Sequence, residues 1–125
     1  MFSLELIDEI EALVGMHQEG SYWDFKREWY GNNKDGDMLI DIICMANNLV
    51  NRDAYIIIGV DEESNYAIRD VSQDTNRRNT QMLTDFIRGK KFAGDFRPVV
   101  TVESVYLDGG LVDVIVIHNS TNTPY

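Results

Sequence analysis

Residues 54–61 read Ala-Tyr-Ile-Ile-Ile-Gly-Val-Asp, and this stretch decides the fold. Its apolar residues follow one another without the alternation of a half-exposed strand. The run from Ala54 to Val60 therefore predicts a strand that is buried on both faces. Such a strand lies in the middle of a sheet that helices cover on both sides. Asp61 follows directly, at the kind of position where open sheets place ligand-binding groups.

Two helices and a short strand are predicted before this central strand. Ser3 is a suitable N-cap for a helix whose apolar residues recur at helical spacing until Gly15 ends it. Residues 22–26 alternate in polarity and predict a short strand. A second helix is predicted from Asp37, its N-cap, to Leu49, and its wide apolar stripe indicates packing on more than one side.

A helix and a β-hairpin are predicted after the central strand. The helix runs from about Thr75 to Arg88, where a glycine follows. Residues 99–107 and 111–118 are rich in β-forming side chains and flank Asp-Gly-Gly at 108–110, which is typical of a hairpin. The order is helix, strand, helix, strand, helix, strand, strand. We therefore expect an α+β fold in which helices flank a mixed β-sheet.

Length and composition favour one globular domain over residues 1–125. The chain has 125 residues, of which 44% are hydrophobic and 26% charged, close to the averages of globular proteins. No apolar run approaches the length of about 20 residues that a bilayer requires, so no membrane association is expected. The first residues lack the basic start and apolar run of a signal peptide, and one cysteine excludes an intramolecular disulfide. These features predict a cytoplasmic protein.

The charge is strongly acidic but unevenly distributed. Asp and Glu number 21 against 11 Lys and Arg, a net charge of −10, which taken alone argues against a nucleic-acid partner. Residues 1–63 carry this whole excess, and residues 64–125 are balanced. One stretch is basic, and its cations are Arg77, Arg78, Arg88, Lys90, Lys91 and Arg97. It is either a solvated helix face with a basic last turn, which the helix dipole favours, or a patch that contacts phosphates.

Three carboxylates are candidates for one site. Glu19 and Asp24 are five residues apart, so they converge only if Glu19 lies in a bend before the strand, which Gly20 makes easy. If the strands that carry Asp24 and Asp61 are neighbours, all three meet at one end of the sheet. Clustered carboxylates take up a proton or hold a cation, and oxygen-only ligands suit Mg²⁺ or Mn²⁺. Lys26 shares the strand face of Asp24 and is placed to neutralise the group or to meet a phosphate.

A simpler interpretation of these residues stays open. Asp24 can pair with Lys26 or Arg27, and Asp61 can begin a turn, in which case no site exists. We expect core packing for Trp23 and Trp29.

The remaining titratable candidates have ordinary interpretations. His17 suits a surface position at a helix end, and His118 a local hydrogen bond. Cys44 lies among apolar residues, so a buried thiol is expected. Neither a phosphate-cradling glycine loop nor the Gly-x-Ser-x-Gly of serine hydrolases is present, which excludes a nucleotide-driven motor and leaves a serine hydrolase unsupported.

Several segments, taken in order, resemble the Schlafen-type AlbA-like domain. Glu19–Lys26 resembles its acid followed by an acid-Phe-Lys strand, Ile43–Asn48 its helix ending in Ala-x-Asn, and Ile56–Asp61 its Ile-Gly-Val-Asp strand. Residues 114–124 resemble its late hairpin with a polar loop and a proline. The resemblance covers residues 10–125 and implies a nucleic-acid-related domain of the kind found in predicted transcriptional regulators of bacteria and archaea.

In animal Schlafen proteins the same fold carries a divalent-metal-dependent endoribonuclease that acts on structured RNA such as tRNA. The resemblance places its three carboxylates on Glu19, Asp24 and Asp61. The second acid of the family is usually Glu, so Asp24 is one methylene shorter, and the Gly-Gly before the Ile-rich strand is replaced by residues 51–53. The family usually continues with another strand beyond Tyr125, so we expect this chain to be the N-terminal part of a longer protein.

Three hypotheses follow. The first is a DNA- or RNA-binding domain of a regulator, and the second adds Mg²⁺- or Mn²⁺-dependent cleavage of RNA. The third is a non-catalytic module that binds a protein, a nucleotide or another small ligand, which the acidic charge favours. A homodimer is expected, because a single-lobed domain needs a partner to form a groove.

Overall fold

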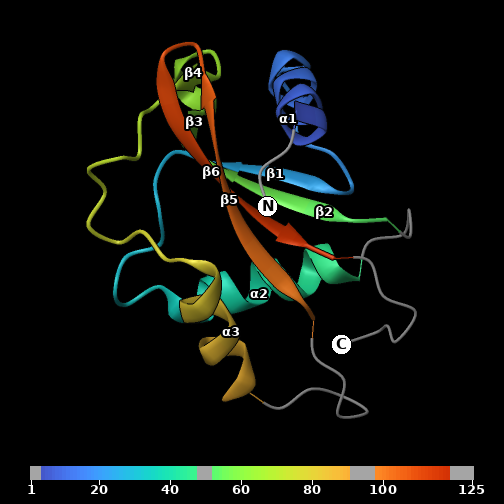
Figure 1. The fold of residues 1–125 in the computed structure, drawn as a ribbon, viewed down its shortest axis with the longest axis vertical. Coiled ribbons are helices and arrows are strands. Elements are labelled where there is room, and N and C mark those ends of the chain that lie inside the picture. Colours follow the sequence, from blue (N-terminus) through green and yellow to red (C-terminus); the bar gives the residue numbers. More distant parts are fainter. Residues whose placement is uncertain (1–3, 48–51, 91–97, 119–125) are drawn as a thin grey trace.

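The computed structural model describes residues 4–47, 52–90 and 98–118 (Figure 1). The elements are, in chain order, α1 (Leu4–Gly15), β1 (Trp23–Lys26), α2 (Asp35–Ala46), β2 (Ala54–Ile58), β3 (Val60–Asp61), the 3₁₀ turn η1 (Glu62–Ser64), β4 (Ala67–Ile68), α3 (Thr80–Arg88), β5 (Val100–Leu107) and β6 (Gly110–Ile117). Within the described residues, no helix is long and apolar enough to span a membrane.

The main sheet has four strands in the order β1-β2-β6-β5. β1 runs parallel to β2, with Asp24 opposite Ile56 and Lys26 opposite Ile58, whereas the other neighbouring pairs are antiparallel. All five residues of β2 are buried. The predictions of a buried central strand and of a mixed sheet with flanking helices are both confirmed.

The two faces of β2 pack against different helices. Ile56 and Ile58 join a cluster with apolar residues of α2 and α3, among them Ile42 and Leu83. Tyr55 and Ile57 join a second cluster on the opposite face with residues of α1. The alternation of a strand places successive side chains on opposite faces, so this unbroken apolar run serves two cores at once.

Gly59 ends the central strand earlier than the sequence pattern predicts. Its φ of 116° lies in a region open almost only to glycine, and a Cβ atom there would lie 2.9 Å from the carbonyl oxygen of Arg69. Its N–H donates to the Lys26 oxygen at 2.7 Å, and its own oxygen accepts from Arg69 N at 2.7 Å. The chain turns here, and β3 pairs with β4 in a second, two-stranded sheet. Asp61 therefore lies outside the main sheet.

The hairpin is confirmed, and its turn is tight. Leu107 pairs with Gly110, and the two residues between them, Asp108 and Gly109, have φ values of 49° and 80°. A two-residue turn with positive φ at both positions matches the right-handed twist of the flanking strands. This turn fixes the register of β5 against β6.

The helices differ in detail from their predictions. α2 begins at Asp35, so Asp37 lies in its first turn and is not its cap. α3 begins at Thr80, where the side chain of Asn79 accepts a hydrogen bond from Met82 N at 2.9 Å. The segment from Thr75 to Asn79 is not helical.

Helix α2 buries one side only. Met38 and Ile42 face the sheet, whereas Ile40 and Cys44 are exposed. Two residues along a helix correspond to about 200° of rotation, so the neighbours of Ile42 at that spacing point away from the sheet. The predictions of a buried Cys44 thiol and of packing on more than one side are therefore wrong.

Candidate functional site

The carboxyl groups of Glu19 and Asp24 lie within hydrogen-bonding reach of each other. The side chains of Trp23 and Phe25 in β1 are buried. The side chain of Asp24 lies on the opposite face of the strand and is 18% exposed. Gly20 forms a bridge with Trp23, so the chain doubles back just before β1. A Cβ atom at Gly20 would collide with the Trp23 indole ring, which explains the glycine in this bend. The bend brings Glu19 close to Asp24, as the sequence predicts if Glu19 lies in a bend before the strand.

Burial and this contact together change the protonation of Asp24. Burial, the hydrogen bond with Glu19 and the charge of Glu19 together raise the pKa of Asp24 from 3.8 to about 6, although Lys26 and the Phe25 N–H act in the opposite direction. Asp24 is partly buried and Glu19 is exposed. Two adjacent carboxylates are held together by a shared proton or by a cation. The two carboxyl groups of Glu19 and Asp24 therefore favour the binding of a proton or a cation between them.

Lys26 connects this pair with helix α2. Its Nζ lies 3.7 Å from Asp24 Oδ2 and 3.2 Å from Asp41 Oδ2, and the Tyr30 hydroxyl donates to the same oxygen of Asp41 at 2.7 Å. Burial alone would lower the pKa of Lys26, but Asp24 and Asp41 outweigh burial and raise it. The Lys26 side chain is therefore a charged ammonium group that ion pairs with Asp24 and Asp41 hold in place. Asp41 was not predicted, because its place beside β1 depends on how α2 packs.

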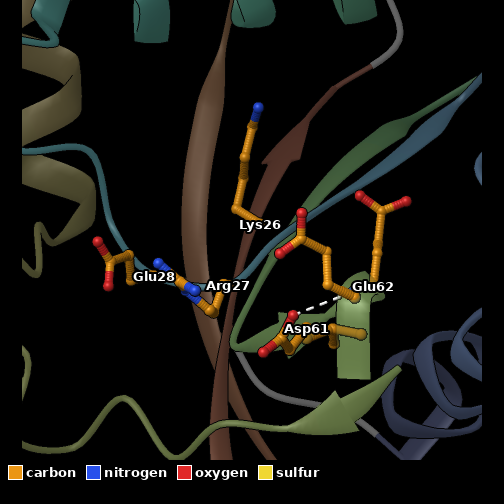
Figure 2. Close-up of a pocket in the computed structure, with 7 residues that line it drawn as sticks. Lys26, Arg27, Glu28, Asp61 and Glu62 are labelled. Carbon is orange, nitrogen blue, oxygen red and sulfur yellow. Dashed lines mark hydrogen bonds between the residues drawn. The ribbon is translucent and has the colours of Figure 1, made fainter. Parts of the chain in front are cut away.

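Asp61 has a different set of partners. Arg69 donates from Nε and Nη2 to Asp61 Oδ2 at 3.1 and 2.9 Å. Glu63 N donates to Asp61 Oδ1 at 3.1 Å, which is the dashed line in Figure 2. The hydrogen bonds from Arg69 are the main reason why the pKa of Asp61 is lowered. Both oxygens of this carboxylate, which is 6% exposed, are thus engaged in structure.

An open hollow of about 360 Å³ lies at the end of β1 beside β3. Figure 2 shows Lys26 on its wall, extending away from Asp61. The residues that line it are Lys26, Arg27, Glu28, Val60, Asp61, Glu62 and Glu63. Lys26 and Asp61 thus face one hollow, but Glu19 and Asp24 are not among its lining residues.

The three predicted carboxylates therefore do not form one group. In the part of the chain that the structure describes, no three His, Cys, Asp or Glu side chains are arranged to hold a metal ion. A three-carboxylate site for Mg²⁺ or Mn²⁺ does not fit this arrangement. Glu19 and Asp24 are the pair that remains as candidate oxygen ligands.

Two of the predicted basic residues stabilise the fold. Arg77 donates to both oxygens of the buried Asp113, at 2.9 and 3.1 Å, and Trp29 Nε1 and Ser104 Oγ also donate to this carboxylate. Arg78 is 13% exposed and donates to Asp35 Oδ1 at 3.0 Å. These guanidinium groups are already occupied by internal acceptors.

The other predicted cations lie at or beyond the end of α3. Arg88 is 70% exposed and lies 3.6 Å from Asp85, and Lys90 lies over the Phe86 ring at 4.8 Å. Lys91 and Arg97 lie outside the described residues. Arg88 is thus more exposed than Arg77 and Arg78, whereas Lys90 is partly buried and has no acidic partner among the described residues.

The smaller predictions are mostly confirmed. Trp23 and Trp29 are buried in the core. His118 forms a local hydrogen bond between Nε2 and Thr101 Oγ1 at 3.0 Å. His17 is exposed after the end of α1 and stacks on Tyr66, a contact that the sequence did not indicate.

Comparison with known proteins gives one positive result. A search of curated proteins found no match. A family model described as Schlafen, AlbA_2 matches residues 19–125, which begin at Glu19 and contain β1, β2 and the hairpin. At a coarse level this family indicates a function related to nucleic acids. The chain belongs to the Schlafen AlbA_2 family.

Proposed function

We propose that this chain is a nucleic-acid-binding domain. The observation that carries the proposal is the family match over residues 19–125. The net charge of −10 does not exclude this function, because the excess lies in residues 1–63 and the region after them is balanced. A local group of cations is enough to contact a few phosphates, although the overall affinity should be modest.

Arg88 and Lys90 are the cations that we assign to phosphate contact. Arg77 is bound to the buried Asp113 and the mostly buried Arg78 to Asp35, so both guanidinium groups already have internal partners. Within the described residues, Arg88 forms a long contact of 3.6 Å with Asp85, and its side chain is largely exposed. A phosphate can therefore replace Asp85 as its partner without loss of structure.

The test is the salt dependence of binding to a fluorescently labelled single-stranded RNA and to a DNA of the same sequence. On a single strand, each lost phosphate contact lowers the slope of log affinity against log salt by about 0.7. The double variant Arg88→Ala/Lys90→Ala should therefore bind more weakly and show a slope lower by about 1.4. Lys34→Ala, which removes another exposed cation, is the control and should keep the slope. No binding by the wild type, or binding that salt does not affect, would contradict the proposal.

A second candidate is RNA cleavage that depends on a divalent cation. The contact between Glu19 and Asp24 favours it, since two touching carboxylates attract a cation. When bound at this pair, Mg²⁺ or Mn²⁺ would polarise a phosphate and activate water. Lys26, held beside Asp24, is placed to approach the same phosphate.

The test is cleavage of a structured RNA such as tRNA with Mg²⁺ or Mn²⁺. Asp24→Asn should abolish cleavage, whereas Asp37→Asn, at an exposed acid of α2, should leave it unchanged. If the wild type cleaves nothing with either ion, or if both variants cleave equally, the second candidate is wrong.

A further inference from the structure

His17 and Tyr66 form a stacked aromatic pair between two distant parts of the chain. Their ring centroids are 4.7 Å apart, and the ring planes differ by 20°. Tyr66 also meets the buried Phe25 edge to face, with centroids 5.4 Å apart. Tyr66 is thus fixed from the core side, and the exposed His17 lies on top of it.

The backbone at both positions is unusual for aromatic residues. The φ values of His17 and Tyr66 are 52° and 60°, in the left-handed region that glycine and asparagine enter at least cost. His17 terminates α1, since its N–H donates to Val14 O at 3.2 Å, and Tyr66 lies in the turn between β3 and β4. Helix and turn geometry explain the backbone conformations. They do not explain why two aromatic rings occupy them.

The pair lies beside the candidate site. His17 is two residues before Glu19, and Tyr66 is in the turn that follows Asp61 and η1. Figure 1 shows α1 and the β3–β4 pair at the same end of the molecule. The stack therefore joins the loop of Glu19 to the loop of Asp61, although the two carboxylates themselves have separate partners.

We propose that His17, backed by Tyr66, is a stacking platform for one base of a single-stranded nucleic acid. This inference rests on the proposed nucleic-acid binding and adds a contact to it. Single-stranded nucleic acids are commonly bound by stacking unpaired bases on aromatic rings, including His and Tyr. A ring that is already held parallel to a second ring loses little freedom when a base joins the stack.

Stacking also suits the charge of this chain. Every base has an apolar face, so stacking does not depend on the attraction of phosphates to cations. In a protein of net charge −10, a contact that needs no positive charge can add affinity where electrostatics contribute little. The platform and the cations of α3 would then contribute separately, the first insensitive to salt and the second sensitive to it.

The experiment compares two labelled probes with the same number of phosphates. One is a short single-stranded oligoadenylate, and the other is an abasic oligomer of the same length. The wild type should bind the oligoadenylate about tenfold more tightly, as expected for one stacked base. His17→Asn retains a residue that tolerates the left-handed backbone but removes the ring, so it should bind both probes equally. His17→Phe keeps a planar ring and should keep the preference.

Two controls separate stacking from structure. Tyr106→Ala removes an aromatic side chain that is 71% exposed on β5, and it should leave the preference unchanged. Thermal unfolding of each variant reports any loss of stability, which should not change the ratio between the probes. If the wild type binds neither probe, nucleic-acid binding itself is wrong and the platform with it. If it binds both equally, or if His17→Asn keeps the preference, the platform is wrong while nucleic-acid binding stands.

Discussion

Asp24 lies in an environment that raises its pKa well above that of an ordinary surface carboxylate. Its side chain is mostly buried beside Glu19, and its pKa in the folded protein is about 6, against 3.8 for the ordinary group. Between these values the folded protein holds a proton that the unfolded chain has released. Asp24 therefore contributes stability at low pH that is lost as the pH rises through about 6.

Asp24→Asn should remove this pH dependence. A shift of this size corresponds to at most about 3 kcal/mol, so the variant should gain up to that free energy of unfolding relative to the wild type between about pH 4 and pH 7. Urea unfolding at both pH values measures the difference. Asp37→Asn, at a carboxylate that is 65% exposed, is the control. A constant difference for Asp24→Asn would show that neither burial nor the Glu19 contact raises the pKa of Asp24.

Arg77 and Asp113 show what residue type alone does not reveal. The basic stretch that contains Arg77 suggests a group of surface cations. The structure instead pairs Arg77, in the segment before α3, with Asp113 at a central position of β6. This pairing joins distant parts of the chain, so the local sequence does not indicate it. Asp113 is 1% exposed and receives hydrogen bonds from three side chains. A buried charge is tolerated only when it is paired in this way. The pair is therefore a requirement of the fold, and Arg77 is not free for a phosphate.

At the scale of elements, the sequence predicts long regular segments and misses short ones. The apolar composition of Ala54–Ile58 predicts a buried strand, and the Asp-Gly turn predicts the hairpin. β3 and β4 have two residues each, too few for any periodic pattern. Helix α3 begins later than predicted, after its N-cap Asn79. Asp74, just before the predicted start, instead accepts a hydrogen bond from Trp29 N at 2.9 Å, a tertiary contact that no local pattern contains.

Gly59 is the element boundary with the largest consequence, and its replacement should be costly. Gly59→Ala combines a positive φ with a Cβ atom 2.9 Å from the Arg69 oxygen, whereas Gly109→Ala in the hairpin has a positive φ and nothing within 4 Å of its Cβ. Strain alone predicts a loss of about 1 kcal/mol at Gly109, and strain with a clash predicts about 3 kcal/mol at Gly59. Chemical denaturation of the two variants measures both losses. Equal losses would mean that the backbone near Arg69 yields without cost.

At the scale of the whole molecule, the site was predictable in part. The meeting of Glu19 and Asp24 followed from a bend at Gly20, which the local sequence contains. The position of Asp61 could not be predicted from the local sequence. Gly59 turns the chain into a second sheet, and Arg69, eight residues further on, donates hydrogen bonds to the Asp61 carboxylate. Local sequence therefore predicted the local half of the site. The rest depends on contacts between elements that only the packed fold brings together.

The response of nucleic-acid binding to Mg²⁺ depends both on the net charge of the protein and on the Glu19–Asp24 pair. In a protein of net charge −10, Mg²⁺ has two opposite effects. It competes with the protein's cations for phosphates, which weakens binding. An ion held between Glu19 and Asp24 would instead remove repulsion and attract a phosphate, which strengthens binding.

We expect the second effect to prevail in the wild type and to vanish in Asp24→Asn. The measurement is the fluorescence anisotropy of a labelled single-stranded RNA, titrated with protein in NaCl and in a MgCl₂–NaCl mixture of equal ionic strength. Replacement of Na⁺ by Mg²⁺ should raise the affinity of the wild type and lower that of the variant. If Mg²⁺ weakens both to the same degree, Glu19 and Asp24 hold no cation in the complex, and the pair is simply two carboxyl groups that share a proton.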